Sequence, residues 1–395
     1  MRPNRALTYA CYFSLVTYSF TVAAWGPAVS LMQETFGIGE AGIGLLRTAM
    51  FVGFTLCVFM GGCFLNRLEL KFTAVLGPAA LGCALTGFSF SGSCPAALLA
   101  MFAAGCAGGM LEASVNTLVS EMHGERRAYA LNLLHVYFGV GAFVAPRAAG
   151  KLLVTGASWR TVYLAISACA FAAAAAFALQ RFPAAREKKP LQAAGLLRFA
   201  ANPAMITLGA GMFFYVGSEI GINDWIVLYL ERFLSLDKLS ASNTLSYYWL
   251  AMTAGRFFCT LAARFVKAES LLVIIASLSA AAAMLIFAAR TPLSAAAFIA
   301  LTGFFSSGIF ATIIAIGGNR FPADVGAVSG ILIGFSGMGN IFFPSLIGTV
   351  AQLVSLKLAL AAACAMLFLL LACAAAAAKT PVRSFRRTSP ASPRS

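Results

Sequence analysis

The sequence predicts an all-α membrane protein with twelve transmembrane helices in two pseudo-symmetric six-helix bundles. Three observations support this fold class. Only 10% of the 395 residues are charged, whereas about a quarter are charged in a soluble protein. Apolar runs of about twenty residues recur along the chain, which is the length an α-helix needs to cross about 30 Å of hydrocarbon. One pattern of glycine and proline occurs once in each half of the chain.

Each apolar run is expected to be a helix, because backbone N–H and C=O groups find no water to bond inside a bilayer. Gly and Pro within several runs argue against the strands of a barrel, which alternate over about ten residues. Little of the chain is left for a soluble core. The expected spans are residues 8–31, 43–65, 72–91, 96–121, 128–153, 159–180, 204–230, 240–263, 269–289, 292–317, 323–351 and 357–378.

The longest hydrophilic connection divides these spans six and six. Residues 181–203, with the sequence RFPAAREKKPLQAAGLLRFAANP, combine charge, proline and amphipathic spacing, and we expect a cytoplasmic linker along the membrane surface. The N-terminal bundle is then residues 1–180 and the C-terminal bundle is residues 204–378. The basic, Ser/Pro-rich tail at 379–395 has the composition of a disordered segment.

The net charge of +15 is interpreted as a topology signal. If the N-terminus is cytoplasmic, most Lys and Arg residues fall in cytoplasmic connections, such as the pair Arg126 and Arg127. This asymmetry follows the positive-inside rule, so we expect a multi-pass protein of the plasma (inner) membrane with both termini in the cytoplasm. No folded basic domain remains for a nucleic-acid partner.

The two halves share a motif of small residues and proline, displaced by 198 residues. The same displacement relates Gly105 to Gly303. Small residues let helices approach closely, and proline frees a backbone carbonyl, so these elements are expected to serve packing and gating. Duplicated halves that share a site near the bilayer midplane are typical of secondary transporters. The two copies are Gly139-x-Gly141-x4-Pro146 and Gly337-x-Gly339-x4-Pro344.

This organisation resembles the major facilitator superfamily over essentially the whole chain. The connection GGCFLNRLELK is similar to the loop between the second and third helices of that superfamily. Gly62, Arg67 and Lys71 match the loop, while Asn66 and Glu69 stand where an acid and a second glycine are usual. The resemblance implies a gating and structural role for the three matching residues.

Carboxylates inside the spans are the first candidates for function, because a charge at mid-span costs about 2.5–3.5 kcal/mol on insertion scales. Of the 13 acidic residues, only Glu112, Glu219 and Asp224 lie away from loops and span ends. Asp224 is expected to be near enough to the outer interface to be solvated. Glu112 and Glu219 are the candidates for proton coupling.

Amides and aromatic rings accompany these acids at helical spacing. Amides and carboxylates bind hydroxyl groups, and aromatic faces stack on a sugar ring, so these residue types together predict a carbohydrate site. His135 is a third candidate for proton coupling, because imidazole titrates near neutral pH. Arg256 is expected to brace the inner gate. The predicted substrate-binding residues are Asn116, Asn132, Tyr18, Trp25, Tyr215, Asn223 and Asn340.

The segments LEASVNTLV, ALNLLHVYFGVGAFVAP and YVGSEIGINDWIVLYL are similar to those of the fucose–galactose–glucose:proton symporters. In that family the fourth helix carries an essential acid and the fifth begins with an L-N-L motif that lines the sugar cavity. The resemblance implies that Glu112 handles the proton and that Asn116 and Asn132 bind sugar.

The sequence therefore predicts a monomeric transporter that moves a small polar solute, a sugar above all, by alternating access with proton symport. Its expected partners are the solute, protons and the lipid bilayer; no cofactor or metal is expected and no enzyme activity. One alternative is a proton-coupled efflux antiporter for small amphiphilic compounds. A second alternative is a membrane sensor or scaffold that transports nothing.

Overall fold

The computed structural model describes residues 4–67, 69–182, 202–322 and 324–379, without the side chains of residues 61–67, 125 and 128. Most of the predicted linker (181–203) and nearly all of the predicted tail (379–395) lie outside the described residues. The predicted gating residues Gly62 and Arg67 belong to the helical stretch of which only the backbone is described. The described part is a bundle of long helices, as the hydropathy of the sequence requires.

The helices follow the predicted spans closely. Eleven stretches are long and apolar enough to cross a membrane. The 25-residue helix α10 is more polar, with Ser and Thr in its first turns, and completes the twelve. The first half holds α1 (Arg5–Ala23), α2 (Trp25–Phe36), α3 (Glu40–Arg67), α4 (Leu70–Phe90), α5 (Cys94–His123), α6 (Arg127–Val154) and α7 (Trp159–Ala178). The second half holds α9 (Pro203–Leu234), α10 (Lys238–Ala262), α11 (Ala268–Leu285), α12 (Pro292–Ser306), α13 (Ile309–Arg320), α14 (Val325–Leu353) and α15 (Leu356–Lys379).

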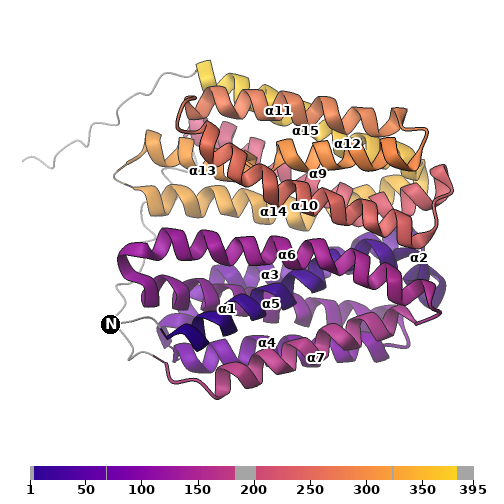
Figure 1. Cartoon of the computed structure of the whole chain (residues 1–395), viewed down its shortest axis with the longest axis horizontal. Helices are drawn as coiled ribbons and strands as arrows, with labels where there is room; N and C mark the ends of the chain where they lie inside the picture. Colours follow the sequence, from indigo (N-terminus) through magenta and orange to yellow (C-terminus); the bar gives the residue numbers. More distant parts are fainter. Residues whose placement is uncertain (1–3, 68, 183–201, 323, 380–395) are drawn as a thin grey trace, which may run out of the picture.

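The two halves form two bundles that lie side by side (Figure 1). They meet along α3 and α14 and along α6 and α10. We call the end of the bundles with the N-terminus the linker face, because α7 ends and α9 begins there. The opposite end, which holds the loop between α2 and α3, is called the far face. This arrangement confirms the predicted fold class of two six-helix bundles.

Two predicted spans are interrupted. The first is broken at Ala24, between α1 and α2. Pro27 follows closely, and proline has no N–H to donate to the carbonyl four residues earlier, so the regular helix cannot pass through this point unchanged. The second break separates α12 from α13 at Ser307 and Gly308. Broken membrane helices are found where backbone groups are buried in protein or line a cavity.

The repeated glycine motif occupies equivalent positions in the two halves. A Cβ atom added to Gly139 of α6 would contact Thr253 of α10. A Cβ atom added to Gly337 of α14 would lie 3.0 Å from Thr55 of α3. The displacement of 198 residues that relates the two glycines also relates Thr55 to Thr253. Both glycines therefore sit at the contact between the halves, and the duplication extends to individual contacts.

Gly105 marks a second close approach, between α5 and α3. A Cβ atom at this position would overlap the backbone carbonyl of Met50. Gly303 has the same relation to the carbonyl of Tyr248, and the displacement of 198 residues relates Met50 to Tyr248. A backbone carbonyl cannot turn aside as a side chain does, so these glycines set the distance between their helices.

We expect Gly105→Ala to lower the free energy of unfolding by about 1–3 kcal/mol, the usual cost of overpacking a filled site. Gly87→Ala is the matched control, because Gly87 also lies inside a helix and a Cβ there meets nothing within 4 Å. Thermal unfolding of both variants in detergent, followed by loss of the monodisperse peak in size-exclusion chromatography, tests the prediction. Equal midpoints for the two variants would contradict it.

Candidate functional site

The first half places a carboxylate deep in the membrane-spanning part. Glu112 lies along α5 and is half-buried. Tyr18 of α1 lies beside it, within electrostatic range. Gly108, one helical turn before Glu112, leaves room for the ring of Tyr18, which a Cβ atom at this glycine would strike. Helices α1 and α5 therefore approach each other closely one turn before Glu112.

Glu112 has no counterion within the part of the chain that the structure describes: no Lys, Arg or His forms an ion pair with it. Asn116, one turn further, donates its side-chain amide to the backbone carbonyl of Glu112 at 3.0 Å. The side-chain oxygen of Asn116 is then the atom available to a ligand. A half-buried acid without a cation is a group that a proton can neutralise.

The second half places a carboxylate and a cation together. Glu219 of α9 is half-buried and interacts with the hydroxyl of Tyr215, one turn earlier. Arg256 of α10 lies within electrostatic range of Glu219. It is also within range of His135 on α6 of the first half. Arg256 therefore lies among the predicted proton-coupling residues. From the sequence it was expected only to brace the inner gate.

The remaining predicted ligands differ in exposure. Asn132 on α6 is exposed, and Asn340 on α14 is half-buried. Tyr18 and Tyr215 are each 3% exposed, so only small parts of their rings can meet a solute in this conformation.

The predicted packing elements fall into two groups. The prolines of the repeated motif are buried inside α6 and α14. In the same motif, Gly141 packs on α1 and Gly339 packs on α9. Lys71 is exposed at the linker face, near the start of α4. The first group comprises Gly141, Pro146, Gly339 and Pro344.

The chemistry of the two carboxylate sites is that of hydrogen bonding and proton exchange. Around them lie amide groups, phenol hydroxyls and one guanidinium. Within the described ranges, no group of three or more His, Cys, Asp or Glu side chains has the arrangement of a metal site. Glu112 therefore has no cation beside it among the described side chains, whereas Glu219 lies within electrostatic range of Arg256.

Asp224 corrects one prediction. From the sequence we expected this residue to be solvated near the outer interface, yet its side chain is 2% exposed. The guanidinium of Arg47 in α3 contacts both of its oxygens, with Nε 3.1 Å from Oδ2 and Nη2 3.1 Å from Oδ1. Helix α9 continues to Leu234, so Asp224 lies about 15 Å below that end at 1.5 Å per residue. The prediction was wrong because the helix extends beyond the apolar run.

Arg47 is the functional candidate that the sequence analysis missed. Its side chain is 1% exposed, although it lies only about 10 Å from the start of α3 at 1.5 Å per residue. Its Nη2 donates to the carbonyl of Val22, in the last turn of α1, at 3.0 Å. The signal in the sequence was an arginine inside an apolar run, which bilayer energetics disfavours.

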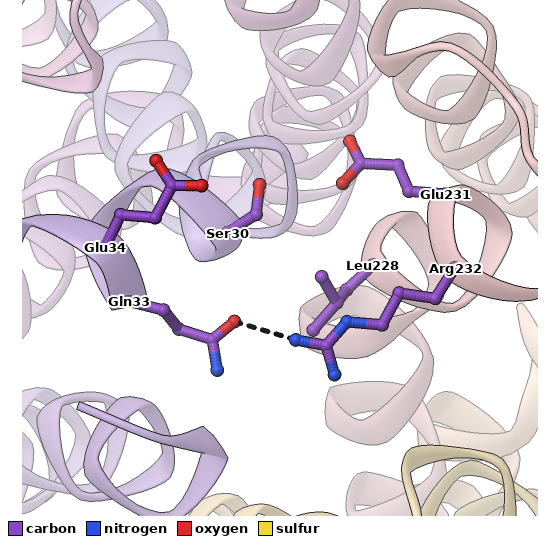
Figure 2. Close-up of a pocket in the computed structure, with 6 residues that line it drawn as sticks. All are labelled: Ser30, Gln33, Glu34, Leu228, Glu231 and Arg232. Carbon is purple, nitrogen blue, oxygen red and sulfur yellow. Dashed lines mark hydrogen bonds between the residues drawn. The ribbon is translucent and has the colours of Figure 1, made fainter. Parts of the chain in front are cut away.

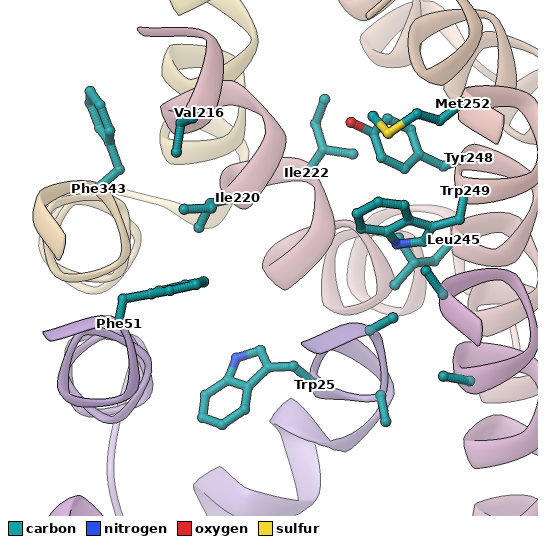
Figure 3. Packing of buried hydrophobic residues seen from close by; sticks show 14 of the residues in the cluster. Trp25, Phe51, Val216, Ile220, Ile222, Leu245, Tyr248, Trp249, Met252 and Phe343 are labelled. Carbon is teal, nitrogen blue, oxygen red and sulfur yellow. The ribbon is translucent and has the colours of Figure 1, made fainter. Parts of the chain in front are cut away.

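Two predicted substrate ligands belong to the surroundings of this ion pair. Trp25 is fully buried, with its ring 5.1 Å from the Arg47 guanidinium. Asn223 is 3% exposed; it donates to Asp224 at 2.7 Å and accepts from the indole of Trp249 at 3.0 Å. Figure 3 shows Trp25 and Phe51 on one side of the packed region and Trp249 on the other. Their predicted contact with a solute requires that this region open.

The far face carries further polar contacts between the halves. Arg232 of α9 forms an ion pair with Glu40 of α3 at 2.6 Å and donates to Gln33 at 3.3 Å. Lys238 of α10 donates to Ser30 of α2 at 2.7 Å. A cavity of about 490 Å³ opens here, away from Glu112. Figure 2 shows its lining residues: Ser30, Gln33, Glu34, Leu228, Glu231 and Arg232. The two halves are therefore joined at the far face.

Comparisons with known proteins agree with this architecture. A family profile described as Major Facilitator Superfamily matches residues 11–299. Protein TsgA of Shigella flexneri is 23% identical over 358 residues, 90% of each chain. The solved structure of the nucleoside transporter NupG superposes with a TM-score of 0.78 at 13% identity, covering 95% of this chain and 100% of that one. A D-xylose-proton symporter superposes with a TM-score of 0.76 at 11% identity, covering 94% and 96%. At these identities, the structural likeness shows a shared fold.

Proposed function

The chain belongs to the Major Facilitator Superfamily, and on this premise we propose that it transports a monosaccharide together with protons by alternating access. Two bundles that rock about a shared central region expose it first to one side and then to the other. In this structure the far face is joined by ion pairs and hydrogen bonds. We take the far face as the outer side, as the distribution of Lys and Arg in the sequence favours.

The observation that carries the proposal is Glu112. It is half-buried in a membrane-spanning helix and has no counterion among the described side chains. A charged carboxylate is stable in contact with water, whereas removal from water favours its neutral, protonated form. When the central region opens to water Glu112 can release its proton, and when the region closes it must hold one. Movement of the bundles is thereby coupled to protonation.

Glu219 supports coupling in a different way. Arg256 stabilises its charged form, so it serves as a fixed acceptor for solute hydroxyl groups while Glu112 carries the proton. His135 completes this cluster from the first half, since Arg256 lies within range of both. Closure of the two halves around a solute therefore brings the two sites together.

The proposed solute is a sugar because the available groups are amides, carboxylates and aromatic rings. Asn116 and Asn132 come from the first half, and Tyr215 and Asn340 from the second. The segments similar to the fucose–galactose–glucose:proton symporters include the first three of these residues. A D-xylose-proton symporter also shares the fold. We further propose that the protein acts as a monomer in the plasma (inner) membrane, with both termini in the cytoplasm.

Uptake by purified protein in proteoliposomes tests the proposal. Labelled hexoses, pentoses and nucleosides are offered with and without an imposed proton gradient, and empty liposomes are the control. Accumulation of a hexose or pentose that depends on the gradient is the expected result. Proton-driven export of amphiphilic compounds without sugar uptake would instead establish the antiporter, and no flux of any compound would leave the sensor or scaffold.

A further inference from the structure

We propose that Arg47 and Asp224 form a charged lock that holds the far face closed, and that its separation is the step that admits solute from that side. This inference rests on the proposed alternating access. It assigns a role in transport to two residues that contact neither Glu112 nor Glu219 among the described interactions. Four observations support it.

First, the guanidinium of Arg47 is held in place by groups of its own half. It lies 5.1 Å from the ring of Trp25 and 4.9 Å from the ring of Phe51. Its Nη2 donates to the carbonyl of Val22, one of the last-turn carbonyls that a helix cannot satisfy internally. The break between α1 and α2 is what ends the helix there. Arg47 therefore keeps its orientation whether or not the second half is in contact.

Second, the carboxylate of Asp224 is held by its own half in the same way. Asn223 Nδ2 donates to Asp224 Oδ1 at 2.7 Å. The indole of Trp249 on α10 in turn donates to Asn223 Oδ1 at 3.0 Å. Each ion of the pair is thus supported by groups of its own bundle, and the ion pair crosses the interface together with a longer hydrogen bond from Asn223 Nδ2 to the carbonyl of Val22 at 3.4 Å.

Third, the pseudo-symmetric copy of this contact is not an ion pair. The displacement of 198 residues relates Arg47 to Leu245 and Gly26 to Asp224. These two counterparts also meet, since a Cβ atom on Gly26 would lie 3.2 Å from Leu245 Cδ2. The inherited contact is therefore an apolar one in one copy and an ion pair in the other.

Fourth, the pair is buried deeply enough for its separation to matter. The side chains are 1% and 2% exposed. Separating a buried pair without hydration leaves two unpaired charges, which is strongly unfavourable. Water that enters from the far face can hydrate both ions as the halves part. Opening on this side is thus coupled to the entry of water, while the closed state keeps the pair dry.

The test measures opening directly, with no substrate. Leu245 is fully buried at the contact between the halves, so in a Leu245→Cys protein the thiol is reached from outside only when the far face opens. Its rate of reaction with a membrane-impermeant methanethiosulfonate is measured in right-side-out vesicles. The same chain without Leu245→Cys gives the background from the native cysteines.

Adding Asp224→Asn, or Arg47→Gln with Asp224→Asn, is expected to raise this rate by about tenfold, within the usual range for coupled conformational equilibria. The double change leaves no unpaired charge, so it remains informative if the single variant does not fold. Asp237→Asn is the control: it removes an acidic charge at the same face, but the hydrogen bonds of Asp237 are to backbone amides in the first turn of α10 in its own half. It should leave the rate unchanged.

An unchanged rate in the folded double variant would overturn the lock, and so would an equal increase in Asp237→Asn. The proposed function fails separately, through the absence of solute uptake by the parent protein. Faster labelling without any sugar uptake would support the lock and reject the sugar. Sugar uptake with an unchanged labelling rate would support the proposed function and reject the lock.

Discussion

Glu112→Gln is expected to abolish proton-driven accumulation of solute while exchange of solute across the membrane continues. Glutamine has the shape of the protonated acid but cannot release a proton, so the bundles can move without coupling. With one proton per solute, a gradient of one pH unit can sustain about tenfold accumulation, since one unit corresponds to about 1.4 kcal/mol. In the variant this ratio should fall to about one.

Two measurements on the same proteoliposomes check this result: accumulation driven by an imposed gradient, and counterflow of labelled against unlabelled solute. Glu34→Gln is the control, because Glu34 is an exposed acid of α2 at the far face. It should accumulate solute as the parent does. Full accumulation by Glu112→Gln would remove this residue from the coupling mechanism.

The second large effect is expected at Arg256. Arg256→Gln leaves the half-buried Glu219 without its cation, so this acid is driven toward its neutral form and loses its role as an acceptor. We expect the initial uptake rate to fall by about tenfold or more, in the range of coupling energies between residues of one charged network. Arg256→Lys keeps the positive charge, so its initial uptake rate should fall much less.

A double-mutant cycle separates this pairing from independent effects. If Arg256 acts through Glu219, then Glu219→Gln added to Arg256→Gln should cost little more than either single change. Uptake rates are compared at equal amounts of reconstituted protein, and size-exclusion profiles report folding. Losses that multiply in the double variant would show that the two residues act separately.

The sequence was sufficient for the positions of the helices and for recognising Glu112 and Glu219 as acids inside them. Hydropathy over about twenty residues depends on the membrane alone, so the ends of most spans were predicted without knowing how the helices pack. The duplication could also be recognised, because the copies Gly139 and Gly337 retain their spacing to Gly141 and Gly339. Glu112 was recognisable as an acid in an apolar run for the same reason.

The partners of these groups could not be predicted from spacing. Arg47 and Asp224 are 177 residues apart, and nothing local to either indicates which helix it faces. Asp224 appeared near a span end because the apolar run ends before the helix does. Trp249 shows the same limit: it is only 3% exposed, because the polar group that its indole binds is Asn223 in the protein interior.

The depth of the Arg47–Asp224 pair bears on how the protein responds to the salinity of its surroundings. Dissolved ions screen charges over about 8 Å at 0.15 M, and they act on exposed groups such as Arg232, which is 45% exposed. The pair below is almost sealed from them. A rise in salt should therefore weaken the exposed Arg232–Glu40 pair while leaving the Arg47–Asp224 pair intact, so the proposed opening of this face should depend little on ionic strength.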